Sequence, residues 1–133
     1  MDLLDPWRDA ADIARRLQSD DAIFVVVIGA QSWCQKCRDI YPLWLELAQK
    51  LTQCALWLDL DEHQEFVGDF VPDDLPWLLI YRGDSVVVSS SVPHTALAAL
   101  PVKLQALQLG ADEPTLPDPG IRARFLCTNW AQS

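Results

Sequence analysis

Positive charge is scarce in this chain. Its 133 residues include 10 Lys and Arg against 19 Asp and Glu, which gives a net charge of -9 at pH 7. The basic residues are scattered along the sequence and form no local patch. A strongly acidic chain repels phosphate backbones and anionic lipid surfaces. We therefore expect neither nucleic acid nor a membrane among its partners.

Long apolar runs are missing as well. The longest, from Ala22 to Ala30, is far shorter than the ~20 residues that span a bilayer. The chain begins with MDLLDP, which is acidic where a secretory signal carries positive charge before a long apolar stretch. Its four cysteines do not resemble the dense disulfide framework of a small secreted domain. These absences favour a cytoplasmic protein with free thiols.

The length is sufficient for one hydrophobic core and too short for two ordinary domains. We predict one domain over residues 1–110 and a C-terminal tail over residues 111–133. Residues 111–120 contain three prolines and three acidic residues, a linker composition. Residues 121–130 are partly alternating, so an added edge strand, a docked helix and a partner-binding tail all remain open.

Hydrophobic periodicity predicts an α/β protein. Apolar runs predict strands at residues 22–28, 54–60, 77–81 and 85–89, and helical spacing predicts helices at 5–17, 34–51, 61–70 and 95–109. The first strand is apolar on both faces, which is typical of a central strand covered by helices on both sides. Gly83 lies in a hairpin-like connection between the last two strands, which should pair antiparallel. We expect a central mixed sheet of four strands, with a fifth left open, and helices on both faces.

Two cysteines suggest the chemistry. Cys34 and Cys37 are separated by two residues, just after an apolar strand and at the start of a helix. The positive end of the helix dipole stabilises a thiolate at Cys34, and Lys36 adds a second favourable charge. Cys34 would attack a substrate disulfide, and Cys37, one helical turn further on, would resolve the mixed disulfide. We therefore expect thiol-disulfide exchange at this pair.

The segment from Ser32 to Cys37, SWCQKC, resembles the active-site segment of thioredoxins, whose usual form is Trp-Cys-Gly-Pro-Cys. Pro42 matches the kinking proline of that family. The segment DLPW, with Leu75, Pro76 and Trp77, resembles the loop where a cis proline, here Pro76, faces the cysteines and exposes backbone for substrate pairing. The resemblance covers roughly residues 5–109.

This resemblance implies a thioredoxin-like fold and a thiol-disulfide oxidoreductase that reduces or exchanges disulfides in protein substrates. It implies no organic cofactor, and electrons from a reductase or a small thiol. Trp33 is expected to form an apolar platform for substrate, while Trp77 is as readily a core residue. The alternative is a non-catalytic interaction or chaperone module on the same fold.

The chain departs from the family pattern at three points. Ile28 stands where thioredoxins usually keep a buried aspartate, and Trp57 stands where its lysine partner is found. Gln35 and Lys36 replace Gly-Pro between the cysteines, a change that should alter the redox potential. Only residues 1–4 precede the first helix signal, which leaves almost no room for the family's first strand. The apolar pair Ile28 and Trp57 weakens the case for fast general reduction and favours the non-catalytic interaction or chaperone module.

A metal site is not expected, because zinc needs about four ligands and the other candidates lack paired spacing. These candidates are Cys54, Cys127, His63 and His94. Cys54 is interpreted as a buried, inert thiol and the two histidines as surface residues at helix starts. Cys127 is interpreted as a packed residue, with an exposed regulatory thiol as the other reading. The acidic stretch that begins at Asp59 is interpreted as a solvated strand end.

Overall fold

The computed structural model describes residues 5–6, 8–18, 22–51, 53–92 and 94–126, with side chains omitted at 94–96. Strand β1 (Ile23–Gly29) is buried at all seven positions and lies inside the sheet. It pairs in parallel with β2 (Cys54–Asp59) and antiparallel with β3 (Trp77–Arg82), and β3 pairs antiparallel with β4 (Ser85–Ser91). The order β2-β1-β3-β4 confirms the mixed sheet of four strands among the described residues.

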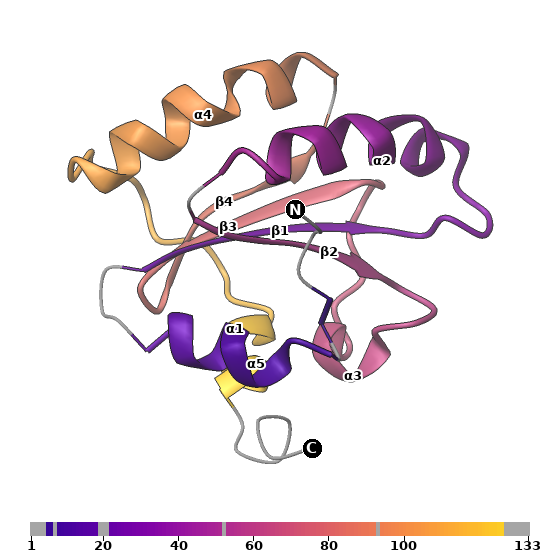
Figure 1. Cartoon of the computed structure of the whole chain (residues 1–133), viewed down its shortest axis with the longest axis horizontal. Coiled ribbons are helices and arrows are strands. Elements are labelled where there is room, and N and C mark those ends of the chain that lie inside the picture. Colours follow the sequence, from indigo (N-terminus) through magenta and orange to yellow (C-terminus); the bar gives the residue numbers. More distant parts are fainter. Residues whose placement is uncertain (1–4, 7, 19–21, 52, 93, 127–133) are drawn as a thin grey trace.

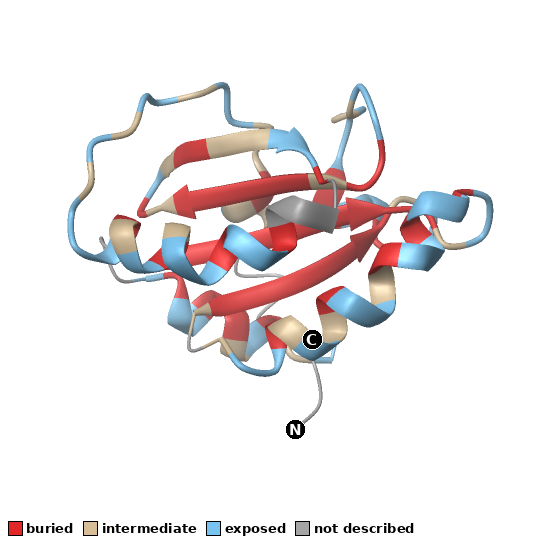
Figure 2. Ribbon diagram, turned by 90° about the horizontal axis from the view of Figure 1, so that it is seen from above, coloured by how far each residue is buried: buried red, intermediate tan, exposed pale blue. Residues whose placement is uncertain are grey.

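Helices cover both faces of this sheet (Figure 1). Helices α2 (Gln35–Ala48) and α4 (His94–Gln108) lie on one face. On the other face lie α1 (Ala10–Arg16), α3 (Gln64–Val67) and α5 (Ile121–Leu126). The buried residues gather in the strands between the two helical layers (Figure 2). This arrangement confirms the prediction of helices on both faces.

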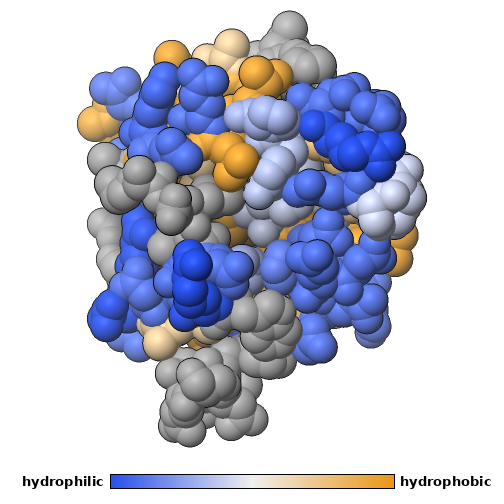
Figure 3. All heavy atoms as spheres, turned by 45° about the vertical axis from the view of Figure 1, so that its right-hand side comes forward, coloured by the Kyte–Doolittle hydropathy of each residue, from blue (hydrophilic) through white to orange (hydrophobic). Residues whose placement is uncertain are grey.

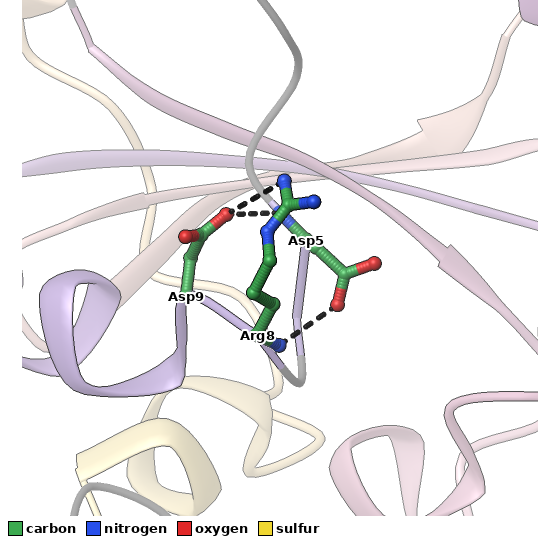
Figure 4. A network of polar contacts seen from close by, with 3 residues as sticks. All are labelled: Asp5, Arg8 and Asp9. Carbon is green, nitrogen blue, oxygen red and sulfur yellow. Dashed lines mark hydrogen bonds and ion pairs between the residues drawn. The ribbon is translucent and has the colours of Figure 1, made fainter.

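The first helix begins later than predicted. It was predicted over residues 5–17, but the regular helix starts at Ala10. The backbone N–H of Arg8 donates to a carboxylate oxygen of Asp5 at 2.9 Å, and the Asp5 N–H donates to the Asp9 carboxylate at 2.7 Å (Figure 4). These two bonds close a single turn, and Asp9 then leaves the helical conformation with φ -103° and ψ 17°. Trp7 lies outside the described residues.

The other helices differ from their predicted bounds mainly at their ends. Both α2 and α4 continue through an internal proline, Pro42 and Pro101 respectively. Helix α3 is shorter than predicted because Gly68 follows it with φ +67°, a conformation that L side chains rarely adopt. A Cβ atom at Gly68 would also lie 2.2 Å from the guanidinium of Arg124. Glycine is therefore required where α5 approaches α3.

Residues 111–126 return to the same core. The Leu116 N–H donates to the Val86 carbonyl at 2.8 Å beside β4, and the Tyr81 hydroxyl donates to Asp118 at 2.6 Å. Phe125 of α5 is fully buried. Residues 121–126 thus form a docked helix, whereas the domain division at residue 110 stays a prediction.

Candidate active site

The first cysteine occupies the cap of α2. Cys34 has an extended conformation, φ -108° and ψ 108°, and its Sγ accepts a hydrogen bond from the Cys37 N–H at 3.2 Å. Its own N–H donates to the Ala30 carbonyl at 2.9 Å, which ties the cap to the residue that follows β1. A cap sulfur receives both the unpaired N–H groups and the positive end of the helix dipole. The cap therefore directs a backbone donor at the sulfur that would act as the nucleophile.

The second cysteine is completely enclosed. Cys34 is 8% exposed and Cys37 is 0% exposed. Burial, and then the hydrogen bond with Cys34, raise the pKa of Cys37 to about 12. Cys37 is therefore a protonated thiol at neutral pH, and Cys34 is the sulfur that a target meets first. The two thiols differ in the way that sequential attack and resolution require.

A tryptophan lies close behind Cys37. Ile28 and Trp57 are both buried, at the two positions where the sequence departs from thioredoxins. An ideal Cβ built on Gly29 would lie 2.3 Å from the Trp57 ring and 3.2 Å from the Cys37 Sγ. The Trp57 ring also meets Tyr41 edge-on, with ring centres 4.9 Å apart. Trp57 therefore fills the space behind the second cysteine.

A cis peptide bond joins Leu75 to Pro76. The Pro76 carbonyl accepts from the Val92 N–H at 3.0 Å, and the Leu75 N–H donates to the Asp74 carboxylate at 2.9 Å. Pro76 has no N–H, and the Leu75 N–H and the Pro76 carbonyl are both bonded. The Leu75 carbonyl is therefore the main-chain group of this pair that accepts no hydrogen bond from a described residue. Trp77 begins β3 and is half-buried, and its indole N–H donates to the Ser89 hydroxyl at 3.0 Å. That bond directs Trp77 toward β4.

A groove of about 320 Å³ separates the start of α2 from this loop. Trp33, which is 61% exposed, Cys34, Lys36 and Leu75 line it together with residues 72–74. The structure thus brings together four of the residues singled out from the sequence, while Cys37, Pro76 and Trp77 are not among the lining residues. The β1–α2 connection lies on the right-hand side of Figure 1, and Figure 3 shows a largely hydrophilic face there.

Asp74 is a residue that the sequence analysis did not single out. Its Oδ1 lies 2.7 Å from the Lys36 Nζ, across the groove. This hydrogen bond raises the pKa of Lys36 and lowers the pKa of Asp74. Asp74 stands two residues before the expected cis proline, and that position was the available signal. The sequence alone does not reveal the pairing, because 38 positions separate the two residues.

Two polar residues near the site are buried, although the sequence analysis placed them in solvent. Asp59 accepts hydrogen bonds from the N–H groups of Gln31, at 3.1 Å, and Asp61, at 2.9 Å. His63 accepts at Nδ1 from the Asp59 N–H at 2.8 Å, and burial lowers the pKa of His63. The prediction that Asp59 and His63 are solvated is wrong, because these backbone N–H groups replace water around both side chains.

No cluster of three or more metal-binding side chains occurs within the described part of the chain. Cys54 is buried, as expected, and burial raises its pKa to about 11. Cys127 lies outside the described residues, as does the side chain of His94. Among the described helices, none has the length and apolar character needed to cross a membrane.

The fold and the site together define a class of protein: an open mixed sheet whose central strand leads into a helix that carries two cysteines, one at its cap and one in its first turn, opposite a cis-proline loop. Residues 9–104 match the family model described as Thioredoxin. The chain belongs to the thioredoxin family. This is a family of thiol-disulfide oxidoreductases that typically act on protein disulfides with reductase partners.

Two curated relatives come from Arabidopsis thaliana. Thioredoxin H5 is 28% identical over 64 residues, which cover 47% of this chain and 54% of the relative. Thioredoxin H4 is 28% identical over 85 residues, which cover 62% of this chain and 68% of the relative. The matched part of this chain therefore spans little more than half the length of the first relative.

Solved structures support the fold. Oxidised thioredoxin O1 from Arabidopsis thaliana has a TM-score of 0.57 at 21% identity, covering 76% of this chain and 94% of that protein. A thioredoxin from Schistosoma mansoni has a TM-score of 0.54 at 22% identity, covering 66% of this chain and 79% of that protein. At these identities the likeness concerns the fold alone.

Proposed function

We propose that this chain reduces or exchanges disulfides in protein substrates through Cys34 and Cys37. The observation that carries the proposal is the position of Cys34, whose sulfur caps α2 and accepts the Cys37 N–H at 3.2 Å. The exposed Trp33 beside it and the cis Leu75–Pro76 peptide across the groove supply a place for an extended target.

In the proposed reaction the Cys34 thiolate attacks one sulfur of the target disulfide. The other target sulfur leaves as a thiolate and takes up a proton, and a mixed disulfide joins Cys34 to the target. Cys37 then loses its proton and attacks Cys34, which releases the second target thiol and leaves a Cys34–Cys37 disulfide. The target gains two electrons and the chain loses two. A reductase or a small thiol returns them.

The other groove residues have supporting roles in this proposal. Trp33 provides an apolar contact for the target. The Leu75 carbonyl, held in place by the cis Pro76, accepts a hydrogen bond from the main chain of the target. Lys36 supplies positive charge near the Cys34 sulfur. Trp77 anchors the end of the cis-proline loop to β4 through its hydrogen bond to Ser89. We place the protein in a reducing compartment, the cytoplasm, without nucleic-acid or membrane partners.

The test is turnover of insulin with a dithiol donor. Cys34→Ser and Cys37→Ser should both abolish turnover, because each removes one sulfur of the exchange. Cys54→Ser is the matched control, since that thiol is buried in β2 away from the groove. If the folded natural chain with reduced thiols gives no turnover, the proposal fails.

The second candidate function is a non-catalytic interaction or chaperone module. The apolar pair Ile28 and Trp57 favours it, because Ile28 supplies no carboxylate at the position where thioredoxins usually keep the acid that helps move the proton of the resolving thiol. On this alternative, a Cys34→Ser, Cys37→Ser double variant keeps full function in the cell. Loss of function in that variant selects the oxidoreductase.

A further inference from the structure

One carboxylate oxygen holds both sides of the groove together. The Oδ1 of Asp74 accepts the Leu75 N–H at 2.9 Å and also lies 2.7 Å from the Lys36 ammonium. Lys36 belongs to the first turn of α2, between the two cysteines, and Asp74 belongs to the loop before the cis proline. The ion pair therefore spans the groove that a target must enter.

The two partners are anchored differently. The Asp74 carboxylate is fixed by a hydrogen bond to the backbone next to it, whereas the Lys36 ammonium is carried by a flexible four-carbon chain. Both side chains are well exposed, Lys36 at 64% and Asp74 at 51%. Exposed ion pairs of this kind contribute little to stability. An incoming cation can therefore replace Lys36, while Asp74 stays in place.

The same bond changes what the loop offers to a target. Because the Leu75 N–H is already bonded to Asp74, the loop presents a carboxylate at the point where a main-chain donor would otherwise be available. Asp73 lies next to it on the groove wall, and the chain carries a net charge of -9. Both add to the attraction of a positive group. The bound ammonium of Lys36 shows which group this carboxylate accepts.

We propose that Asp74 is a specificity-determining residue that binds a Lys or Arg side chain adjacent to the reactive cysteine of the target. Lys36 occupies this position when no target is bound. The inference rests on the proposed function, because it concerns the same groove and the same attacking sulfur.

The experiment uses two separate peptide substrates, each with one cysteine held in a disulfide. They differ only in the residue next to that cysteine, Lys in one and Glu in the other. The rate of mixed-disulfide formation is measured in a Cys37→Ser background, which stops the reaction after the first step. We expect the Lys peptide to react about fivefold faster than the Glu peptide, the ratio that one exposed ion pair supplies.

Three variants separate this role from general charge. Asp74→Asn should remove most of the rate ratio, while Asp73→Asn, which removes the same charge from the adjacent position, should keep most of it. Lys36→Gln should increase the ratio, because it removes the internal competitor. A structural role of the ion pair would move both peptides together and leave the ratio unchanged.

Equal loss of the ratio in Asp73→Asn and Asp74→Asn would overturn the inference, as would equal rates for the two peptides with the natural groove. These results leave the proposed function standing, since Cys34 still reacts. If Cys34 reacts with neither peptide, the proposed function fails and the inference fails with it.

Discussion

At the scale of single residues, the environment of Cys37 is set by Gly29 and Trp57. The two come from neighbouring strands, and the tryptophan ring occupies the space that any larger side chain at position 29 would need. Interiors are packed closely enough that one additional methyl group is felt. Gly29 is therefore a packing requirement of this particular site, independent of any unusual backbone angle.

Gly29→Ala is expected to lower the free energy of unfolding by about 1–3 kcal/mol, the usual cost of overpacking a core. The new methyl would meet the Trp57 ring first and the Cys37 sulfur next. Urea denaturation measures the loss. Adding Trp57→Leu to this variant opens space and should recover part of it. A double variant as unstable as the sum of the two single ones would contradict this explanation.

The two active-site thiols should differ in reactivity. At pH 8 iodoacetamide is expected to modify Cys34 well before Cys37, because burial keeps Cys37 enclosed and its pKa at about 12. Peptide mass spectrometry after timed quenching gives both rates. Cys54 is an internal control, since burial raises its pKa to about 11 and it should also react slowly. Modification of Cys37 as fast as Cys34 would disprove the assignment of attacking and resolving thiols.

At the scale of elements, α5 completes the layer formed by α1 and α3. The Phe125 ring stacks on Phe66 with ring centres 4.2 Å apart and meets Phe24 of β1 edge-on at 5.7 Å. The Arg124 guanidinium donates to the carbonyls of Phe66 and Val67 at the end of α3. This helix contributes core residues, as an element of the sheet's covering layer does.

Phe125→Ala is expected to cost about 3–5 kcal/mol, because it removes a fully buried ring and leaves a cavity. Urea denaturation followed by tryptophan fluorescence measures the change. Leu109→Ala is the matched control: this large apolar side chain is 81% exposed, so its truncation should change stability by less than about 0.5 kcal/mol. Equal effects of the two substitutions would mean that α5 is not part of the core.

At the scale of the whole molecule, Cys37, Cys54 and Tyr81 are harder to deprotonate in the folded state than in the unfolded chain. Burial is the main cause in each case, and it raises the pKa of Cys37 to about 12, that of Cys54 to about 11 and that of Tyr81 above its ordinary value. In the unfolded chain these groups lose their protons at a lower pH than in the folded protein. Folding therefore becomes less favourable as the solution becomes alkaline.

The urea midpoint is expected to be constant through neutral pH and to fall above about pH 9, where unfolded thiols ionise with a pKa near 9.0. The fall should continue until the folded pKa values of about 11 and 12 are reached. Midpoints measured between pH 7 and 10.5 test this. Cys54→Ala should give a shallower decline, because one of the ionising groups is gone. A midpoint independent of pH over this range would contradict the raised pKa values.

Periodicity along the chain was sufficient to predict the four strands and the helices on both faces, because each strand buries an apolar run and each helix buries apolar residues three or four positions apart. It was less reliable where side chains bond to nearby backbone. The start of α1 was displaced by the bonds that the Asp5 and Asp9 carboxylates accept from backbone N–H groups, and Asp59 and His63 are buried because backbone N–H groups satisfy them. Such bonds depend on conformations that hydrophobic patterning does not reveal.

The sequence by itself determined the dithiol pair, its place between an apolar strand and a helix, and the family resemblance, because these features depend on residues close together in the chain. Only the tertiary structure decided that Lys36 meets Asp74, that Trp57 encloses Cys37, and that α5 docks on α3. Each of these contacts joins segments far apart in sequence. Folding alone brings them together, since the burial of one shared core sets which distant side chains become neighbours.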